Sequence, residues 1–294
     1  MARPVAVVTG AARGIGLETA RRLSTTHRVA LLDLDAESIQ RAASELGDAV
    51  AVACDIADPD AVVGAVERVV AECGGIDVCI SNAGIATAGA LRLLHPDVLA
   101  AQVNINLIGN WRFIHACLPH VVARRGYVLG VASAAALLAP PGLGAYGASK
   151  AGLEQLLNVL RIEVRHLGVD VGVAYLLWID TEMVRGADRQ HQGFAAMRAT
   201  LRGPAGRTLP VGEAAAAIVR GVERRARRVV VPRSLGAMYR LRGLLPELFE
   251  RETLKVVRDL EGHTAEMVAA RGDFAAGLSP GERGSEAAAR SAGR

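Results

Sequence analysis

Residues 5–16 read Val-Ala-Val-Val-Thr-Gly-Ala-Ala-Arg-Gly-Ile-Gly, and an amphipathic segment follows to about Thr26. A short apolar run, a glycine-rich stretch and an amphipathic pattern predict a strand, a turn and a helix in that order. Glycines let the backbone turn sharply and approach a pyrophosphate, which then lies at the helix N-terminus. A tight turn without any ligand has the same spacing, so this motif needs support from the rest of the chain.

The alternation of strand-like and helical segments continues through most of the 294 residues. It predicts an α/β fold, a doubly wound parallel sheet (Rossmann-like) with helices on both faces. Expected strands cover 5–9, 29–33, 49–54, 77–81, 126–132, 169–177 and 228–231. Expected later helices cover about 97–123, 146–166 and 211–225.

The same pattern predicts one domain with a C-terminal helical extension. We expect the dinucleotide-binding and catalytic domain at 1–234, with a lid at about 182–210 over the active site. An amphipathic, basic extension should follow at 235–271. The Gly-, Ala- and Ser-rich stretch 272–294 is expected to be a disordered tail.

Candidate ligand-binding residues follow the predicted strands. Gly10, Asp33, Asp55 and the run Asn82-Ala83-Gly84 all come at strand ends, where parallel sheets bind ligands. Asp33 stands about twenty residues after the glycine turn, where a carboxylate can accept a hydrogen bond from a ribose 2′-hydroxyl and repel a 2′-phosphate. It therefore favours NAD over NADP. Arg13 in the turn argues for NADP, and a helix cap is the alternative role for Asp33.

Tyr146 and Lys150 are four residues apart at the start of a predicted helix and so share one helical face. An ammonium group beside a phenol favours the phenolate and lowers the Tyr pKa, which turns a poor base into a useful one. Ser133 precedes Tyr146 by thirteen residues, at the end of a predicted strand. An unrelated surface Tyr and Lys are the alternative.

Taken together, these motifs resemble the short-chain dehydrogenase/reductase family. They are Thr9-Gly10-x-x-x-Gly14-Ile15-Gly16, Asn82-Ala83-Gly84, Asn106-Leu-x-Gly109, Ser133 and Tyr146-x-x-x-Lys150, within residues 4 to about 231. The resemblance implies an NAD(P)-dependent alcohol dehydrogenase or carbonyl reductase with Asn106, Ser133, Tyr146 and Lys150 as catalytic residues. It further implies that Asn106 holds a water relaying protons to Lys150, and that Lys150 binds the nicotinamide ribose.

The resemblance also implies a cofactor site. Its expected members are Gly10, Arg13, Gly14, Ile15, Gly16, Asp33, Asp55, Ile56, Asn82, Ala83, Gly84, Tyr146, Lys150, Ile179 and Thr181. Asp55 and Ile56 would contact the adenine, and Thr181 the nicotinamide carboxamide. Leu176-Leu177 replace the Pro-Gly usual in the family shortly before that Thr, which changes the expected shape of the nicotinamide side.

Candidate substrate-contacting residues are mainly apolar and predict an apolar secondary alcohol or ketone. They are Leu137, Leu138, Leu143, Leu177, Trp178 and Met183. Arg185, Arg189 and His191 in the lid would instead suit an acid or an acyl carrier, unless they are simply solvated.

The net charge of +4 is uneven, because residues 198–255 hold thirteen Arg/Lys and five Asp/Glu. No helix-turn-helix, zinc or aromatic RNA-binding pattern accompanies this charge, so no nucleic-acid partner is expected. A basic, apolar stretch at 225–249 could lie on an anionic membrane, and packing against the core or a neighbouring subunit is the alternative. Relatives suggest a homodimer or homotetramer, by analogy alone.

Four Cys without metal-like spacing predict reduced, buried thiols, and no metal site is expected. The N-terminal residues show no secretory signal and no apolar run reaches the length of a spanning helix, so we expect a cytoplasmic protein.

A nucleotide-binding regulatory protein without turnover is the rival hypothesis. The complete Ser133, Tyr146, Lys150 and Asn106 set argues against it, because binding alone needs no proton relay.

Overall fold

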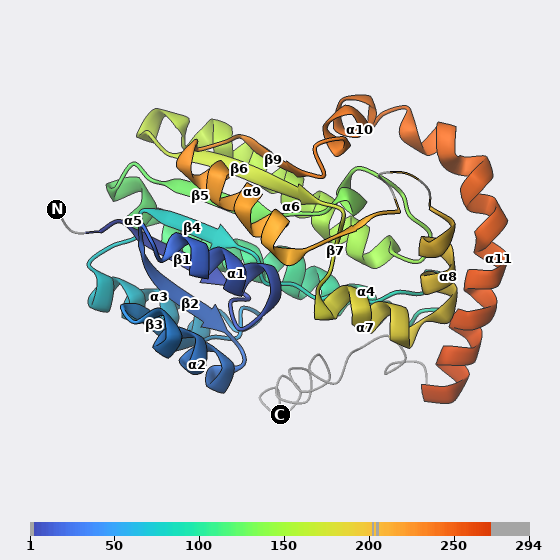
Figure 1. Ribbon diagram of the computed structural model, residues 1–294, viewed down its shortest axis with the longest axis horizontal. Coiled ribbons are helices and arrows are strands. Elements are labelled where there is room, and N and C mark those ends of the chain that lie inside the picture. Colours follow the sequence, from blue (N-terminus) through green and yellow to red (C-terminus); the bar gives the residue numbers. More distant parts are fainter. Residues whose placement is uncertain (1–2, 202, 204–205, 272–294) are drawn as a thin grey trace.

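A seven-stranded parallel sheet in the order β3-β2-β1-β4-β5-β6-β9 forms the centre of the computed structural model, which describes residues 3–201, 203 and 206–271 (Figure 1). The doubly wound α/β fold is confirmed, whereas the expected tail at 272–294 lies outside the described residues. The strands are β1 (Val5–Thr9), β2 (Arg28–Asp33), β3 (Ala49–Ala53), β4 (Val78–Ser81), β5 (Tyr127–Val131), β6 (Asp170–Leu176) and β9 (Arg228–Val231). A separate two-stranded ladder joins β7 (Trp178–Ile179) to β8 (Thr208–Leu209).

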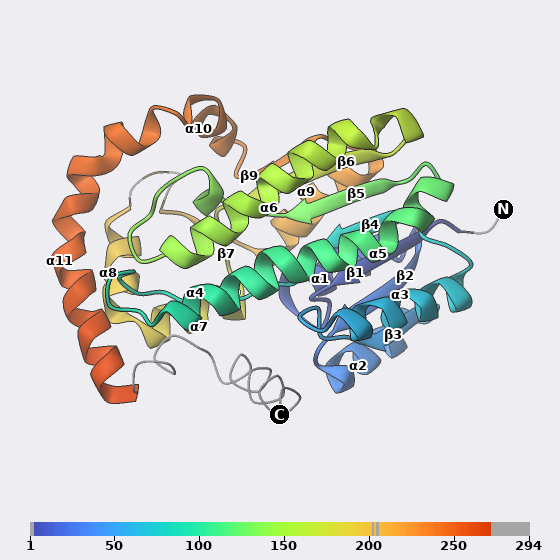
Figure 2. The same cartoon turned by 180° about the vertical axis from the view of Figure 1, so that it is seen from behind.

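Helices cover both faces of the sheet, as Figures 1 and 2 show from opposite sides. They are α1 (Gly14–Leu23), α2 (Ala36–Leu46), α3 (Pro59–Cys73), α4 (Pro96–Val103), α5 (Asn110–Ala123), α6 (Gly144–Glu163), α7 (Glu182–Gln190), α8 (Gln192–Thr200), α9 (Val211–Glu223), α10 (Leu235–Leu241) and α11 (Leu245–Arg271). Short 3₁₀ segments lie at Ala134–Ala136 and Arg165–Leu167, and a π-helical segment at Asn104–Gly109 joins α4 to α5.

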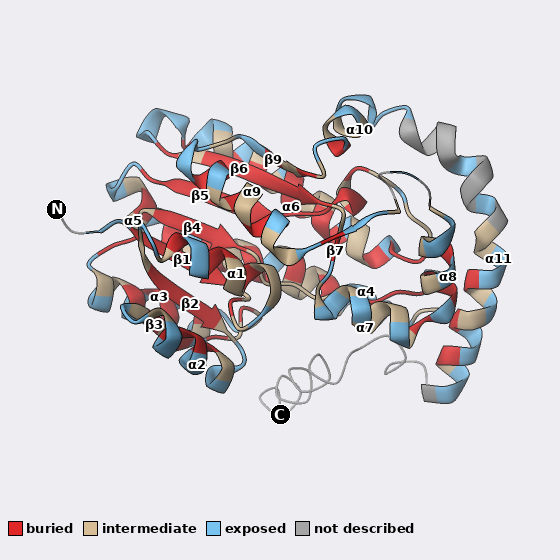
Figure 3. Cartoon of the chain, in the orientation of Figure 1, coloured by how far each residue is buried: buried red, intermediate tan, exposed pale blue. Residues whose placement is uncertain are grey.

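Figure 3 shows that the strands are mostly buried. Their side chains alternate between two apolar cores, one on each face of the sheet. Val5 and Val7 of β1 point to the side of α3, α5 and α6, while Ala6 and Val8 point to the side of α1, α2 and α9. Because both faces are covered, the strands are nearly continuous apolar runs, which is the pattern that the sequence showed.

The direction of strand order reverses at β1, which lies between β2 and β4. The segments after β1 and β4 therefore meet at the carboxyl edge of the sheet. The backbone N–H of Asn82 donates to Thr9 Oγ1 at 2.9 Å, and Asn82 Nδ2 donates to the Thr9 carbonyl at 2.9 Å. Open α/β sheets bind their ligands in the crevice at such a reversal, so this edge is where a site is expected.

The C-terminal extension packs onto the domain. Leu235 is buried in the core beside α6, and the Tyr239 ring lies 5.2 Å from that of Tyr175. Arg242 forms an ion pair with Glu154, a nearly buried carboxylate that also accepts a hydrogen bond from the Tyr175 hydroxyl. Helix α11 then runs along the end of the molecule beside α8 (Figures 1 and 2). In the stretch 235–242, the expected basic extension therefore packs against the core, which was the alternative to a membrane contact.

Candidate active site

Tyr146 and Lys150 lie on the first two turns of α6, as predicted. Lys150 is 3% exposed, and its ammonium group donates to the Val131 carbonyl at 2.9 Å. Its Nζ stands 5.9 Å from the centroid of the Tyr146 ring. The helical spacing of four residues thus places the two groups together at the carboxyl end of β5.

The direction of the Tyr146 pKa shift differs from the expectation. Burial lowers the pKa of Lys150 to about 8. Burial also raises the pKa of Tyr146, and a hydrogen bond with Ser133 only partly opposes that effect. The expected lowering of the Tyr146 pKa by Lys150 is therefore wrong for the protein without ligands. Tyr146 is a neutral phenol at neutral pH, because its loss of solvent disfavours the phenolate.

Ser133 comes directly after β5 and turns the chain into a short 3₁₀ segment. Its hydroxyl accepts from the backbone N–H of Ala135 at 3.1 Å and points to the Leu176 carbonyl at 3.5 Å. Leu176 closes β6 and is buried, and the N–H of Leu177 donates to the Val231 carbonyl at 2.9 Å. The two leucines that replace Pro-Gly therefore continue the sheet beside Ser133.

Asn106 lies in the π-helical segment that interrupts the helix expected over 97–123. Its Oδ1 accepts from the N–H of Ile85 at 2.8 Å, and its Nδ2 donates to the Ile85 carbonyl at 2.8 Å and to Ser149 Oγ at 3.0 Å. A buried amide costs stability unless it is paired, and this one is paired on both sides. The side chain joins the segment after β4 to α6. The water relay at Asn106 stays a prediction.

Gly84 allows the segment after β4 to lie close to the side chains of Asn106 and Lys150. A Cβ at this position would lie 2.9 Å from Asn106 Oδ1 and 3.3 Å from Lys150 Nζ. Any side chain here would push the two groups apart, so the glycine is required by close approach.

Sequence reasoning missed Asn110, one turn after Asn106. Its Nδ2 donates to the carbonyls of Ala83 at 2.9 Å and Ile105 at 3.0 Å, and Ser81 Oγ donates to its Oδ1. The available signal was a second amide at i+4 in an otherwise apolar helix, which predicts a polar contact on the same face.

The glycine turn fits a pyrophosphate. Gly10 and Gly14 have φ of +64° and +58°, and a Cβ on Gly16 would lie 2.1 Å from the Gly10 carbonyl oxygen. No side chain caps the start of α1, so the N–H groups of its first turn remain open to an anion. A Cβ on Gly14 would stand 3.6 Å from Thr181 Cγ2, which places Thr181 across the turn.

Asp33 lies at the end of β2 beside this turn. Its Oδ2 accepts from the N–H of Ala12 at 3.0 Å, and its Oδ1 from the N–H of Asp35 at 3.2 Å. The cap of α2 is Asp35, which accepts from the N–H of Ser38 at 3.0 Å. The helix-cap alternative for Asp33 is therefore wrong.

The remaining expected cofactor residues lie at the same edge or next to it. Asp55 accepts from the N–H of Ala57 at 2.8 Å, and Ile56 is buried. Arg13 is exposed at the start of α1, and Ile179 is buried in β7. The structure thus gathers the glycine turn, the strand-end carboxylates and the Asn82–Gly84 run at one edge of the sheet.

An apolar cluster lies beside Tyr146, built from the lid, the loop before α6 and α11. Its buried members are Ala88, Ala90, Leu143, Phe194, Met197 and Leu260, with Tyr146, Trp178 and Val256 packed against them. Of the expected substrate residues, only Leu143 and Trp178 belong to it. Leu137, Leu138 and Leu177 pack into the core beside α6 instead, and Met183 is 39% exposed on α7.

The two lid arginines singled out from the sequence form ion pairs. Arg185 pairs with Asp180, and Arg189 with Glu182. His191 is not solvated, since it is 2% exposed. These contacts leave little of the positive charge that an acidic substrate would need.

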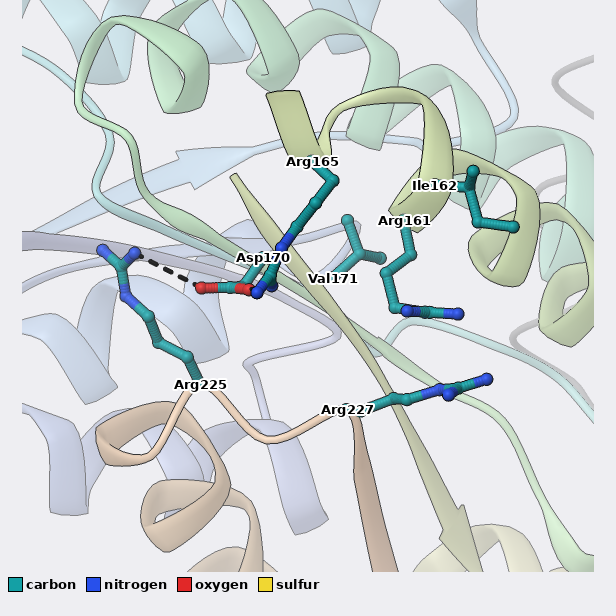
Figure 4. A pocket seen from close by; sticks show the side chains of 7 residues that line it. All are labelled: Arg161, Ile162, Arg165, Asp170, Val171, Arg225 and Arg227. Carbon is teal, nitrogen blue, oxygen red and sulfur yellow. Dashed lines mark hydrogen bonds and ion pairs between the residues drawn. The ribbon is translucent and has the colours of Figure 1, made fainter. Parts of the chain in front are cut away.

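A separate cavity of about 460 Å³ lies at the opposite edge of the sheet, where β6 and β9 begin (Figure 4). It is lined by Arg161, Ile162, Arg165, Asp170, Val171, Arg225 and Arg227. Arg165 and Arg225 both pair with Asp170. This cavity is remote from Tyr146 and contributes nothing to the site.

Two features are absent from the described part of the chain. Within 3–201, 203 and 206–271, no helix has the length and hydropathy to cross a bilayer. The same part of the chain holds no group of three or more His, Cys, Asp or Glu side chains suited to a metal ion.

Comparison with known proteins shows what this chain is similar to. Residues 4–192 match the family model described as short chain dehydrogenase. The chain is 34% identical over 191 residues to 2-(R)-hydroxypropyl-CoM dehydrogenase of Xanthobacter autotrophicus, covering 62% of this chain and 76% of that protein. It is 32% identical to dehydrogenase/reductase SDR family member 7B of Bos taurus, covering 61% of this chain and 59% of that protein.

Two solved structures share the fold. One is a short chain dehydrogenase/reductase from Burkholderia phymatum in complex with NAD, with a TM-score of 0.74 and 23% identity over 84% of this chain and 95% of that one. The other is a 3-ketoacyl-(acyl-carrier-protein) reductase from Brucella melitensis complexed with NADH, with a TM-score of 0.71 and 27% identity over 78% of this chain and 97% of that one.

Replacing Lys150 with Met should change how stability depends on pH. Below about pH 8 Lys150 is charged in the folded protein, and the free energy of unfolding of the wild type is lowered by the full cost of burying that charge. Between about pH 8 and the ordinary Lys pKa of 10.5, the folded protein has lost a proton that the unfolded chain keeps, so the wild type becomes more stable as the pH rises. The stability of Lys150→Met relative to wild type should therefore fall by about 2–3 kcal/mol between pH 7 and 10. Urea denaturation at both pH values measures it, and a pH-independent difference would contradict the buried charge.

Proposed function

The chain belongs to the short-chain dehydrogenase/reductase family, and from this premise we propose that it transfers a hydride between a nicotinamide cofactor, NAD in preference to NADP, and an apolar secondary alcohol or ketone. One observation carries the proposal: Ser133, Tyr146 and Lys150 come together at the sheet edge that also holds the glycine turn. The substrate and coenzyme preference rest on the side chains described above.

A bound nicotinamide supplies the hydride chemistry, and the protein supplies the proton and the geometry. Tyr146 donates a proton to the carbonyl oxygen in reduction and removes it from the hydroxyl in oxidation. Ser133 holds the same oxygen, an arrangement that favours developing negative charge. The raised pKa of Tyr146 suits the donating role, because the phenol keeps its proton until a carbonyl arrives.

Lys150 is placed to serve both the cofactor and Tyr146. Within the described residues, one of its three ammonium hydrogens has a partner, the Val131 carbonyl. The other two can donate to the hydroxyls of a ribose. In oxidation the nearby positive charge favours the Tyr146 phenolate electrostatically, although burial opposes it in the ligand-free protein.

The proposed preference for NAD rests on Asp33. Its carboxylate lies beside the glycine turn, held by the N–H groups of Ala12 and Asp35. A second negative charge from a 2′-phosphate would be repelled there, while a 2′-hydroxyl could donate to the carboxylate.

The proposed apolar substrate rests on the cluster beside Tyr146. Arg198 of the lid lies 4.6 Å over the Trp178 ring and pairs with Asp188. Since this charge is already paired, the cluster favours an uncharged, apolar group next to the reacting carbon.

Tyr146→Phe should reduce turnover by roughly 10²–10⁴-fold, because general acid–base catalysis is lost while the ring remains. The measurement is A340 across a panel of lipophilic alcohols with NAD and ketones with NADH, beside cofactor binding by fluorescence. Cofactor binding should survive. Full activity in the variant would refute the role of Tyr146, and cofactor binding by wild type without turnover of any panel member would favour the regulatory rival.

Asp33→Asn should relax discrimination against NADP by roughly tenfold or more, because it removes the charge and keeps an acceptor for the N–H of Ala12. The ratio of kcat/KM with NAD and NADP measures it. Asp35→Asn is the matched control, since Asp35 caps α2, and its ratio should stay at the wild-type value. An unchanged ratio in Asp33→Asn would remove the basis for NAD preference.

A peripheral membrane enzyme acting on lipid-like substrates is the second candidate. Leu241 and Leu244 are 52% and 56% exposed and stand next to exposed arginines. Co-sedimentation with anionic vesicles should be lost in the double variant Leu241→Gln, Leu244→Gln if they make the contact. Binding that is equal in both proteins, or absent in wild type, would dismiss this candidate.

A cytoplasmic location and a homodimer or homotetramer remain predictions. Light scattering of the purified protein measures the oligomeric state.

A further inference from the structure

Helix α11 reaches the apolar cluster beside Tyr146 from outside the segment that matches the family. The family match ends at residue 192, whereas α11 spans Leu245–Arg271. Leu260 is 1% exposed and belongs to the same cluster as Leu143 and Phe194. A Cβ on Gly142 would lie 3.1 Å from Leu260 Cδ1, so the helix contacts the loop that leads into α6.

A buried polar junction fixes this part of α11. Thr264 is fully buried, and its hydroxyl donates to the Leu260 carbonyl at 2.7 Å. The same oxygen accepts from the backbone N–H of Ala90 at 2.9 Å and lies 2.8 Å from His191 Nε2. One side chain thus connects α11, the loop after β4 and the lid.

The hydrogen-bond roles at the junction define one tautomer of His191. Because the Thr264 hydroxyl hydrogen is used on Leu260, His191 Nε2 must carry the hydrogen that it donates to Thr264. His191 Nδ1 then accepts from the N–H of Phe194 at 3.0 Å, which caps α8. Every polar atom is satisfied, and burial lowers the pKa of His191, which keeps the ring neutral.

A second anchor holds the start of the extension. Arg242 pairs with Glu154 on α6, one turn after Lys150. The extension is therefore attached to α6 through Arg242, just before α11 begins. It is attached again to the lid through Thr264, within α11, which runs along the end of the molecule (Figures 1 and 2).

We propose that α11 is a wall of the substrate site, in which Leu260 determines the size of the apolar group that the enzyme accepts and Thr264 is the positioning residue that holds the wall. This rests on the proposed function. The substrate class is a secondary alcohol or ketone whose apolar substituent packs against Leu143, Phe194 and Leu260. The cluster around Leu260 is apolar, and Arg198, the cation that lies over the Trp178 ring at its edge, is paired with Asp188, so size and not charge decides selection at this wall.

The first test is selectivity across a series of methyl ketones of increasing chain length and branching with NADH. Leu260→Ala should shift the ratio of kcat/KM for the bulkiest and the smallest ketone by roughly tenfold or more toward the bulkiest, because the lost side chain leaves space. Leu254→Ala is the matched control, since Leu254 lies on the same helix and is 62% exposed. Leu260→Val is the milder variant, should Leu260→Ala not fold.

The second test reads the junction without turnover. Thr264→Val removes the hydroxyl at constant shape, so hydrogen exchange of the Ala90 amide should accelerate by tenfold or more, while Thr264→Ser keeps the protection. Thr264→Val should also raise KM for bulky ketones by a larger factor than it lowers kcat for small ketones.

The outcomes separate the two proposals. Selectivity in Leu260→Ala that equals that of Leu254→Ala overturns the wall, and unchanged Ala90 exchange in Thr264→Val overturns the positioning role. Absence of turnover by wild type on every ketone and alcohol is a failure of the proposed function itself.

Discussion

Lys150 keeps an ammonium group inside the protein, where the Val131 carbonyl is its partner among the described residues. An isolated buried charge is expensive, so its surroundings must be held in place by the rest of the fold. The end of β5 supplies the carbonyl, and Gly84 leaves room for the ammonium group. Asn106 ties the segment after β4 to α6. The parallel sheet is what brings these distant segments to one edge.

Sequence reasoning reached most of this arrangement, because the signals were local. The strands are buried apolar runs, the glycine turn is a short motif, and Tyr146 and Lys150 share a face by helical period. The rule that ligands bind beyond the carboxyl ends of strands then grouped Gly10, Asp33 and Asn82 correctly at one edge. Each inference needed only neighbours in sequence or the order of strands.

What escaped prediction depends on contacts between distant segments. His191 and Thr264 are 73 residues apart, and neither is marked by any local pattern. The sign of the Tyr146 pKa shift follows from burial, which a hydrogen bond with Ser133 only partly opposes. Part of that burial comes from a cluster of side chains that are distant in sequence, on the lid and α11. The π-helical turn at Asn106 has no sequence periodicity of its own, because it follows from the hydrogen bonds that the amide must make. Leu137 and Leu177 looked like pocket residues because the sequence cannot say which apolar face meets the core.

The placement of α11 also has a consequence for biosynthesis. A ribosome releases the strands, the glycine turn and α6 long before residues 245–271, and domains fold largely as they emerge. The nascent sheet can therefore bring the glycine turn and the ends of β2 and β4 together while the apolar cluster beside Tyr146 is still incomplete. The cluster is complete only after Leu260 has been synthesised and has packed into it. The lid gains its hydrogen bond between His191 and Thr264 at the same stage. Under the proposed role of Leu260, selectivity for substrate size would thus be the last property that the folding chain acquires, after Ser133, Tyr146 and Lys150 have come together.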